Sequence, residues 1–387
     1  MKNRLYFLDN FRTFLVFLVV LFHAQFVYVQ SLETIWIVSD PVKNNAIGLI
    51  GMYIDLFVMC GLFFVSGYFI PASLKQKSGW AFVVSKFKRI ILPWLIAVLT
   101  LIPTYKAIYL FSRGLPQEKW FTYFHWFQRV DGNPYLFSDN LSQNWLWFLP
   151  VLFIFQIIYY GFSRLKILPE KMSVKTGVLA VFVGGLFYSL LISALNFTGW
   201  HDSILLHFQR ERFAVYFLVF MLGALCFEKD VFSSEKRNKK FVIINVVLTI
   251  ALGVYTVAAL NLFFNIAVPD RNFFFISEFA DLFLYYVSQL LSMLSFIYIL
   301  TNLFRFKFNK TNALLKHLSN NSYSVYIIHM IVLGIIGLGM LNIHLPAFVK
   351  YVLLATLTFI VSNVLAYFYK KYFQKISIIQ PYKQDNV

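Results

Sequence analysis

Arg12 and His23 are the two ionisable side chains of an otherwise apolar run near the start of the chain, RTFLVFLVVLFH. An ionisable group inside a membrane helix is costly, so it indicates a function by default. The eleven-residue spacing is almost three α-helical turns, so both side chains lie on one face, about 16 Å apart along the helix axis. We expect Arg12 at the cytoplasmic edge of the membrane and His23 about half way through the helix.

This pair of residues suits a ligand with an anionic head and a thin reactive arm. A guanidinium binds phosphate through two hydrogen bonds, and a neutral imidazole can act as a general base. The head would stay in the cytoplasm while the arm reaches His23. The sequence leaves two plainer interpretations open, namely a structural histidine at position 23 and an orientation charge at position 12.

A second group of basic residues begins the third apolar segment, in the run SKFKRIILPW. Lys86 and Arg89 are three residues apart, so an α-helix places them on one face. They could complete a phosphate clamp beside Arg12. Orientation of the protein in the membrane would explain the same charges.

Polar residues near the C-terminus form a third candidate group, in the run SYSVYIIH. Ser322, Tyr326 and His329 fall on roughly one helical face. A hydrogen-bonded structural cluster is the favoured interpretation, and a contribution to the same internal cavity as His23 is the alternative.

Small residues interrupt an aromatic helix in the run LFFVSGYF, where Ser66 and Gly67 are adjacent. Small residues allow close helix packing, and packing is the expected role here. Upstream, Asp55 is expected to face the bundle interior, although a position near the outer interface would also fit. Arg129, Arg210 and Arg212 could meet an acidic acceptor, but we expect them on the solvated surface.

The composition indicates that membrane helices carry or position these residues. Of 387 residues, 59% are hydrophobic and only 13% are charged, whereas soluble domains have about 25% charged residues. These values exclude a soluble globule and a disordered chain. The net charge of +17 lies in short clusters between apolar runs. This placement indicates orientation in a lipid bilayer and not binding to nucleic acid.

The hydrophobic pattern predicts an all-α, polytopic membrane protein with ten spans. With the N-terminus in the cytoplasm, 25 of the 34 basic residues fall in inside segments, so both termini are expected to be cytoplasmic. Residues 1–371 are expected to form one domain and residues 372–387 a short cytoplasmic tail. The predicted span cores are residues 13–28, 46–70, 90–111, 145–162, 177–197, 213–227, 241–264, 282–304, 322–340 and 348–369.

The longest predicted loop, residues 112–144, lies outside and carries Trp120 and Trp126. Together with Trp145, these tryptophans are candidates for the acceptor side of a site. Other signatures are missing from the sequence: it has no Gly-rich phosphate loop, no zinc motif and no nucleophile elbow. The two cysteines, Cys60 and Cys226, lie inside apolar runs and suggest neither a disulfide framework nor a metal site.

In order along the chain, these motifs resemble membrane acyltransferase family 3, and the branch containing glucan biosynthesis protein C most of all. Four segments carry the likeness. Residues 6–23 match the family's LD-x-x-R and Arg-x10-His motifs, and residues 62–69 match its FFV-x-SG helix. Residues 146–149 resemble HLWFL, and residues 322–329 resemble SY-x-(I/L)Y-x-x-H.

The chain departs from the family pattern at three positions. Cys60 replaces an acidic residue that often precedes the second motif, and Lys86 replaces an arginine. Trp145 stands where a histidine often precedes the third motif.

The resemblance implies an O-acyltransferase in the bacterial inner membrane. Its donor substrate would be cytoplasmic acyl-CoA (acetyl-CoA or succinyl-CoA), with no tightly bound cofactor and no metal. Its acceptor would be a hydroxyl of an extracytoplasmic carbohydrate such as a glucan. The roles implied are catalysis by His23, coenzyme binding by Arg12, Lys86 and Arg89, and support by Asp9, Ser66, Tyr326 and His329. The rival hypotheses are a polysaccharide exporter or membrane transporter and a non-catalytic membrane partner.

Overall fold

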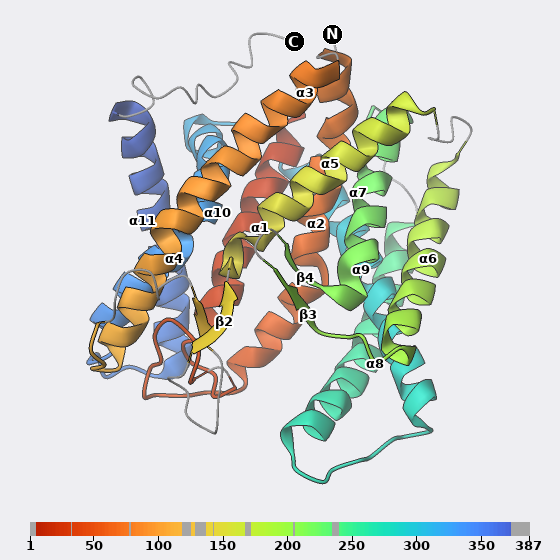
Figure 1. Cartoon of the computed structure of the whole chain (residues 1–387). Helices are drawn as coiled ribbons and strands as arrows, with labels where there is room; N and C mark the ends of the chain where they lie inside the picture. The colour runs from red at the N-terminus through yellow and green to blue at the C-terminus, as the bar shows by residue number, and fades with distance from the viewer. Residues whose placement is uncertain are drawn as a thin grey trace.

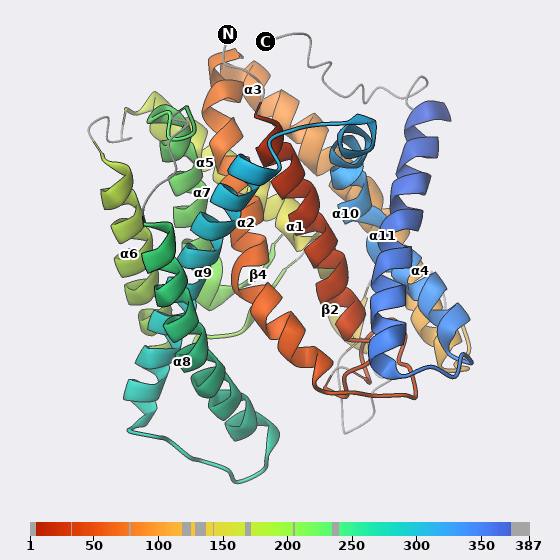
Figure 2. The ribbon, with the colours of Figure 1, turned by 180° about the vertical axis from the view of Figure 1, so that it is seen from behind.

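The computed structural model describes residues 5–31, 33–76, 79–117, 143–166, 172–203, 206–233 and 240–372, together with the backbone of 125–127 and 137–141. These residues form a bundle of long helices with two small antiparallel hairpins (Figure 1). The first helix begins and the last helix ends at the same end of the bundle (Figures 1 and 2). The bundle confirms the predicted all-α polytopic membrane fold.

The helices are named here in their order along the chain. They are α1 (Tyr6–Gln25), α2 (Ile47–Gln76), α3 (Gly79–Lys86), the π-helical turn η1 (Phe87–Ile91), α4 (Leu92–Ser112), the 3-10 turn η3 (Asn144–Trp147), α5 (Phe148–Arg164), α6 (Val174–Ala194), the 3-10 turn η4 (Arg210–Arg212), α7 (Phe213–Glu228), α8 (Phe241–Ala267), α9 (Glu278–Lys307), α10 (Ala313–Met340) and α11 (Ala347–Tyr372). Strand β1 (His125–Phe127) pairs with β2 (Phe137–Leu141), and β3 (Trp200–Asp202) pairs with β4 (His207–Gln209).

Nine helical segments of the described chain are long and apolar enough to cross a membrane, and α3, η1 and α4 together form one of them. The sixth predicted span is present as α7, but its 16 residues fall short of the approximately 20 that a bilayer requires. The chain enters α7 from the β3–β4 hairpin and η4 instead of from a longer helix. The helix packs closely against α2 inside the bundle. Contact with neighbouring helices therefore surrounds α7 with apolar side chains, although the helix is short for a membrane span.

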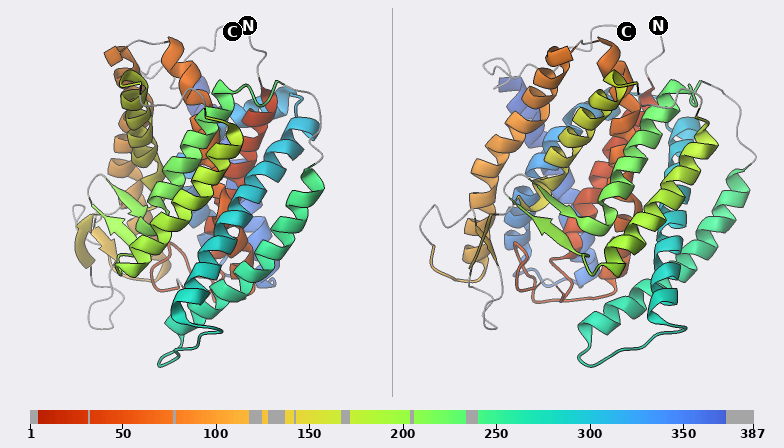
Figure 3. Two further views of the ribbon diagram at one scale, coloured as in Figure 1. Left: turned by 90° about the vertical axis from the view of Figure 1, so that its right-hand side faces the viewer. Right: turned by 45° about the vertical axis from the view of Figure 1, so that its right-hand side comes forward.

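Basic side chains concentrate at the end of the bundle where α1 begins, here called the basic end. This distribution agrees with the predicted alternation of the helices. In the described residues the basic end carries Arg12, Lys75, Lys86, Lys88, Arg89, Arg164, Lys166, Lys175, Lys229, Lys240, Arg305, Lys307, Lys310, Lys316, Lys370 and Lys371. The opposite end carries Lys43, Lys106, Arg113, Arg210, Arg212, Arg271 and Lys350. Figure 3 shows that α8 and α9 extend past the other helices at the opposite end.

Two glycines bring the backbones of α2 and α7 into direct contact. A Cβ atom added to Gly67 would lie 1.9 Å from the carbonyl oxygen of Phe220, and one added to Gly223 would lie 2.1 Å from that of Phe64. No side chain can relieve these contacts, because the opposing atoms belong to the backbone. The predicted packing role of the Ser66–Gly67 pair is therefore confirmed for Gly67.

We expect Gly67→Ala to separate α2 from α7 and to destabilise the folded protein. Overpacking of this kind costs about 1–3 kcal/mol, and more where the backbone must move. The measurement is the thermal unfolding midpoint of the detergent-solubilised protein. Gly253→Ala on α8 is the matched control, because no neighbouring atom lies within 4 Å of its added Cβ. Equal midpoints for the two variants would contradict the close approach.

Candidate active site

Helices α1 and α10 run in the same direction from the basic end and form one continuous seam. The Asn10 amide donates hydrogen bonds to the carbonyls of Phe308 (2.7 Å) and Lys310 (3.0 Å), which fixes the start of α10 beside α1. The Arg12 guanidinium donates to the carbonyl of Ser319 at 3.3 Å. About three turns further on, His23 meets His329. Arg12 and His23 therefore share the face of α1 that points toward α10, as their spacing predicted.

The two histidines form a directed hydrogen-bond chain. Nδ1 of His329 lies 2.7 Å from the carbonyl oxygen of Tyr326, and its Nε2 lies 2.9 Å from Nδ1 of His23. A carbonyl oxygen can only accept, so Nδ1 of His329 carries its proton and Nε2 of the neutral ring is an acceptor. Nδ1 of His23 must then donate, which leaves the lone pair of neutral His23 on Nε2. This is the protonation state that a general base requires.

The position of His23 within its helix differs from the prediction. The helix ends at Gln25, so His23 lies in the last turn of α1 and not half way along it. The helix begins at Tyr6, earlier than the apolar run suggested, because its first turns pack against the start of α10. His329, in contrast, lies well inside α10. His23 is half-buried, whereas His329 has 0% of its surface exposed, so His23 is the more exposed ring of the pair.

Aromatic side chains from three segments surround the histidine pair. The Trp36 ring stacks on His23 with centroids 5.8 Å apart, and the Trp145 ring meets His329 edge-on at 6.5 Å. The Trp145 indole donates to the carbonyl of Ile327 at 2.9 Å, while the Tyr326 hydroxyl donates to the carbonyl of Trp145. Tyr326 is therefore hydrogen-bonded to both His329 and Trp145.

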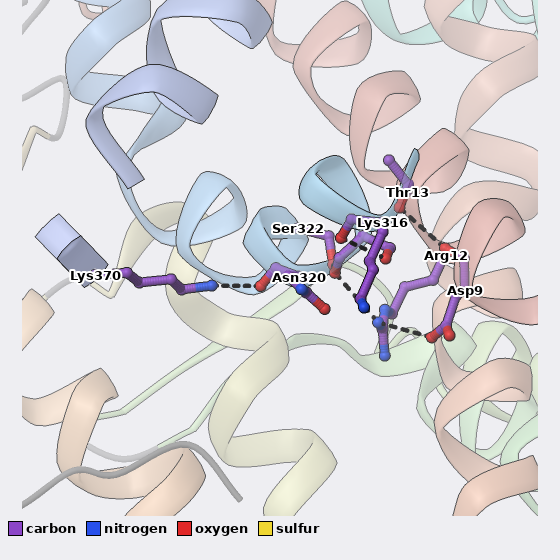
Figure 4. A network of polar contacts seen from close by, with 8 residues as sticks. Asp9, Arg12, Thr13, Lys316, Asn320, Ser322 and Lys370 are labelled. Atoms are coloured by element: carbon purple, nitrogen blue, oxygen red, sulfur yellow. Dashed lines mark hydrogen bonds and ion pairs between the residues drawn. The ribbon is translucent and has the colours of Figure 1, made fainter. Parts of the chain in front are cut away.

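At the basic end, Asp9 holds the Arg12 side chain in place through an ion pair of 3.1 Å. The carbonyl of Asp9 also accepts a hydrogen bond from the Thr13 hydroxyl at 2.9 Å. Figure 4 shows the Lys316 side chain extending toward Arg12, with Lys370 reaching Asn320 from α11. Sequence reasoning counted Lys316 and Lys370 only as orientation charges, because nothing in their spacing links them to Arg12.

Arg89 is hydrogen-bonded to α10 at Tyr323, one turn beyond Ser319. Its backbone carbonyl accepts a hydrogen bond from the Tyr323 hydroxyl at 3.1 Å, and its side chain is exposed. Lys86 lies with its ammonium 5.2 Å from the centre of the Phe82 ring. The turn that follows Lys86 is π-helical, so the simple α-helical spacing expected for Lys86 and Arg89 does not hold across it.

The comparisons with known proteins agree with this geometry. A family model that describes an acyltransferase domain, that of acyltransferase family 3, matches residues 5–367. The chain belongs to acyltransferase family 3. It is accordingly a multi-pass membrane O-acyltransferase. No curated protein and no solved structure matches it significantly, and its branch within the family stays a prediction.

The remaining predicted residues of the acyltransferase lie apart from the histidine pair or outside the described residues. Ser66 is half-buried on α2, next to the glycine contact with α7. The side chains of Trp120 and Trp126 lie outside the described residues, and so does Arg129. The Asp55 side chain on α2 is 33% exposed, and its carboxylate accepts a hydrogen bond of 2.5 Å from Arg212.

The expectation of a solvated Arg212 is wrong. Only 9% of the residue is exposed, because it precedes the buried helix α7 and pairs with Asp55 on α2. A buried arginine requires such a partner, since an uncompensated charge inside the bundle would be costly. The acid that would have revealed this pair lies 157 residues earlier in the chain.

Proposed function

We propose that this acyltransferase moves an acetyl or succinyl group from cytoplasmic acyl-CoA to a hydroxyl of an extracytoplasmic carbohydrate, across a bacterial inner membrane. The observation that supports this proposal best is the α1–α10 seam. It carries Arg12 at the basic end and the histidine pair about 16 Å further along the helix. A donor with a phosphate-bearing head and a slender thioester arm fits both features.

The basic end offers several cations to the coenzyme phosphates. Arg12 would bind a phosphate through its guanidinium, and Lys316 and Lys370 would add positive charge beside it. Arg89 and Lys86 would approach from the other side of α10, where the Arg89 side chain is exposed. Positive charge at this end also fits a cytoplasmic orientation.

The histidine pair would perform the proton transfer. Nε2 of His23 takes the proton of the acceptor hydroxyl while the hydroxyl oxygen bonds to the thioester carbon. The carbon–sulfur bond then breaks, and the departing thiolate takes the proton from His23. His329 holds His23 in the reactive tautomer and, through its Nε2 lone pair, stabilises the transient imidazolium. A covalent acyl-histidine intermediate is the alternative mechanism.

The acceptor would approach from the opposite end of the bundle, where aromatic side chains gather. Trp147 packs edge-on against Trp200 with ring centroids 5.7 Å apart, and Trp200 is 45% exposed. Trp145 belongs to the same turn η3 as Trp147, and its ring lies close to His329. Flat aromatic faces suit the apolar faces of sugar rings, and this supports a carbohydrate acceptor.

Arg12→Gln tests the donor half of the proposal. In vesicles containing the purified protein, we expect the KM for acyl-CoA to rise about 10- to 100-fold, since charge-assisted hydrogen bonds contribute about 1.5–3 kcal/mol. The measurement is release of free coenzyme A thiol when acyl-CoA is added at the basic end. Lys371→Gln, on the exposed last turn of α11, is the control and should leave KM unchanged. Thiol release with an unaltered KM in Arg12→Gln would contradict this donor site, and sugar uptake without thiol release would favour a transporter.

A further inference from the structure

The connection between α1 and α2 is held in a fixed shape by the far end of α4. Five consecutive carbonyl groups, those of residues 33–37, accept hydrogen bonds from α4 or the residue that follows it. Arg113 donates to two of them, at 2.7 and 2.9 Å, and Tyr109 donates to a third at 2.6 Å. Such complete pairing of a loop backbone is the arrangement expected of a segment that must hold one conformation.

The same connection is also packed against the helices at its back. Gly334 and Gly337 of α10 leave room for Ile37 and Val38. A Cβ atom added to Gly334 would lie 2.5 Å from the Cδ1 atom of Ile37. Asp40 forms an ion pair with Lys350 of α11, and both residues are fully buried. The loop is therefore fastened to α4, α10 and α11 at once.

The side chain that this loop presents to the histidine pair is Trp36. Its ring lies nearly parallel to the His23 ring, with an angle of 21° between the planes, and Phe26 packs beside it at 4.7 Å. Trp36 is 8% exposed, and its indole Nε1 has no hydrogen-bond partner among the residues that the structure describes. Buried indole N–H groups usually find an acceptor, so this one calls for an explanation.

We infer that Trp36 is a further catalytic residue, whose indole N–H donates a hydrogen bond to the oxygen of the reacting acyl carbonyl beside His23. This inference rests on the proposed function. An indole N–H is a donor only and carries no charge. The indole therefore does not compete with Nε2 of His23 for the proton of the acceptor hydroxyl. It is suited to donate a hydrogen bond to an oxygen atom that gains negative charge during the reaction.

The reaction gives this donor a defined task. When the acceptor oxygen bonds to the thioester carbon, the carbonyl electron pair moves to the carbonyl oxygen, and the hydroxyl proton passes to Nε2 of His23. The oxygen carries the negative charge until the carbon–sulfur bond breaks and the carbonyl forms again. A donor that is already in position stabilises this charge without rearranging. The five hydrogen bonds to the loop carbonyls would hold the Trp36 indole in such a position.

Trp36→Phe removes the N–H group and keeps an aromatic ring on His23. We expect kcat to fall about 100-fold, the lower range for loss of one oxyanion donor, with the KM for acyl-CoA changed less than about threefold. Replacing Trp36 by benzothienylalanine, which keeps the bicyclic shape and has sulfur in place of N–H, should give the same loss. This second variant separates the donor role from a packing role.

Trp94→Phe is the matched control, because Trp94 is also buried with an unpartnered indole nitrogen and belongs to α4. It should keep the wild-type kcat. A benzothienylalanine variant with wild-type kcat would overturn the inference, and so would a change confined to KM. If His23→Gln loses activity in the same assay, the proposed function stands independently of that outcome. If His23→Gln also keeps its activity, the proposed function itself fails.

Discussion

Replacing His23 by glutamine should lower the rate of acyl transfer by about 10²- to 10⁴-fold, the usual contribution of a positioned general base. Glutamine can still donate a hydrogen bond to Nε2 of His329, so the seam between α1 and α10 should stay closed. It cannot take up the proton of the acceptor hydroxyl. We therefore expect the loss in kcat, with the variant inserted and folded as well as the wild type. Thiol release from acyl-CoA in the presence of acceptor measures it.

The control for this experiment is His344→Gln, which alters an exposed histidine in the connection between α10 and α11. That variant should transfer acyl groups at the wild-type rate. Because the proposed mechanism assigns the proton transfer to His23, His329→Gln should be less damaging than His23→Gln. A His23→Gln enzyme with near-normal turnover would remove the histidine from the mechanism, whatever the fate of the other residues.

Much of the fold could be predicted from the sequence, because bilayer spans and basic clusters are local signals. The sixth span shows where this reasoning ends. Its apolar residues were recognised, but the shortness of α7 is compensated by its packing against α2 through Gly67 and Gly223. That compensation depends on a contact between segments more than 150 residues apart, which single-sequence hydropathy does not report.

The candidate site likewise contains some residues that the sequence predicted and others that only the three-dimensional packing reveals. The Arg12–His23 spacing predicted a shared helix face correctly, because both residues belong to one helix. Trp36 was missed, since a loop residue has no periodicity that would point it at His23. Lys316 and Lys370 were recognised only as charges, because the approach of Lys316 to Arg12 and of Lys370 to Asn320 depends on how α10 and α11 pack.

The buried ion pair between Lys350 and Asp40 fastens the loop that carries Trp36 to α11. The side chains are 0% and 1% exposed. The second carboxylate oxygen of Asp40 accepts a hydrogen bond from the backbone N–H of Val42 at 2.9 Å, and the backbone N–H of Asp40 donates to the carbonyl of Val27 at 3.0 Å. Asp40 thus connects both ends of the loop to α11. Removing one charge would leave the other buried without a partner.

Lys350→Met should therefore cost about 3–5 kcal/mol of stability, the usual effect of breaking a buried pair from one side. Thermal unfolding in detergent measures this loss, with Lys371→Met on the exposed last turn of α11 as the control. Adding Asp40→Asn to Lys350→Met removes the stranded carboxylate and should recover part of the stability. Turnover should remain low in the double variant, because the loop is no longer held to α11 and Trp36 loses its fixed position on His23. If Lys350→Met unfolds at the wild-type temperature and turns over normally, the ion pair does not hold the loop.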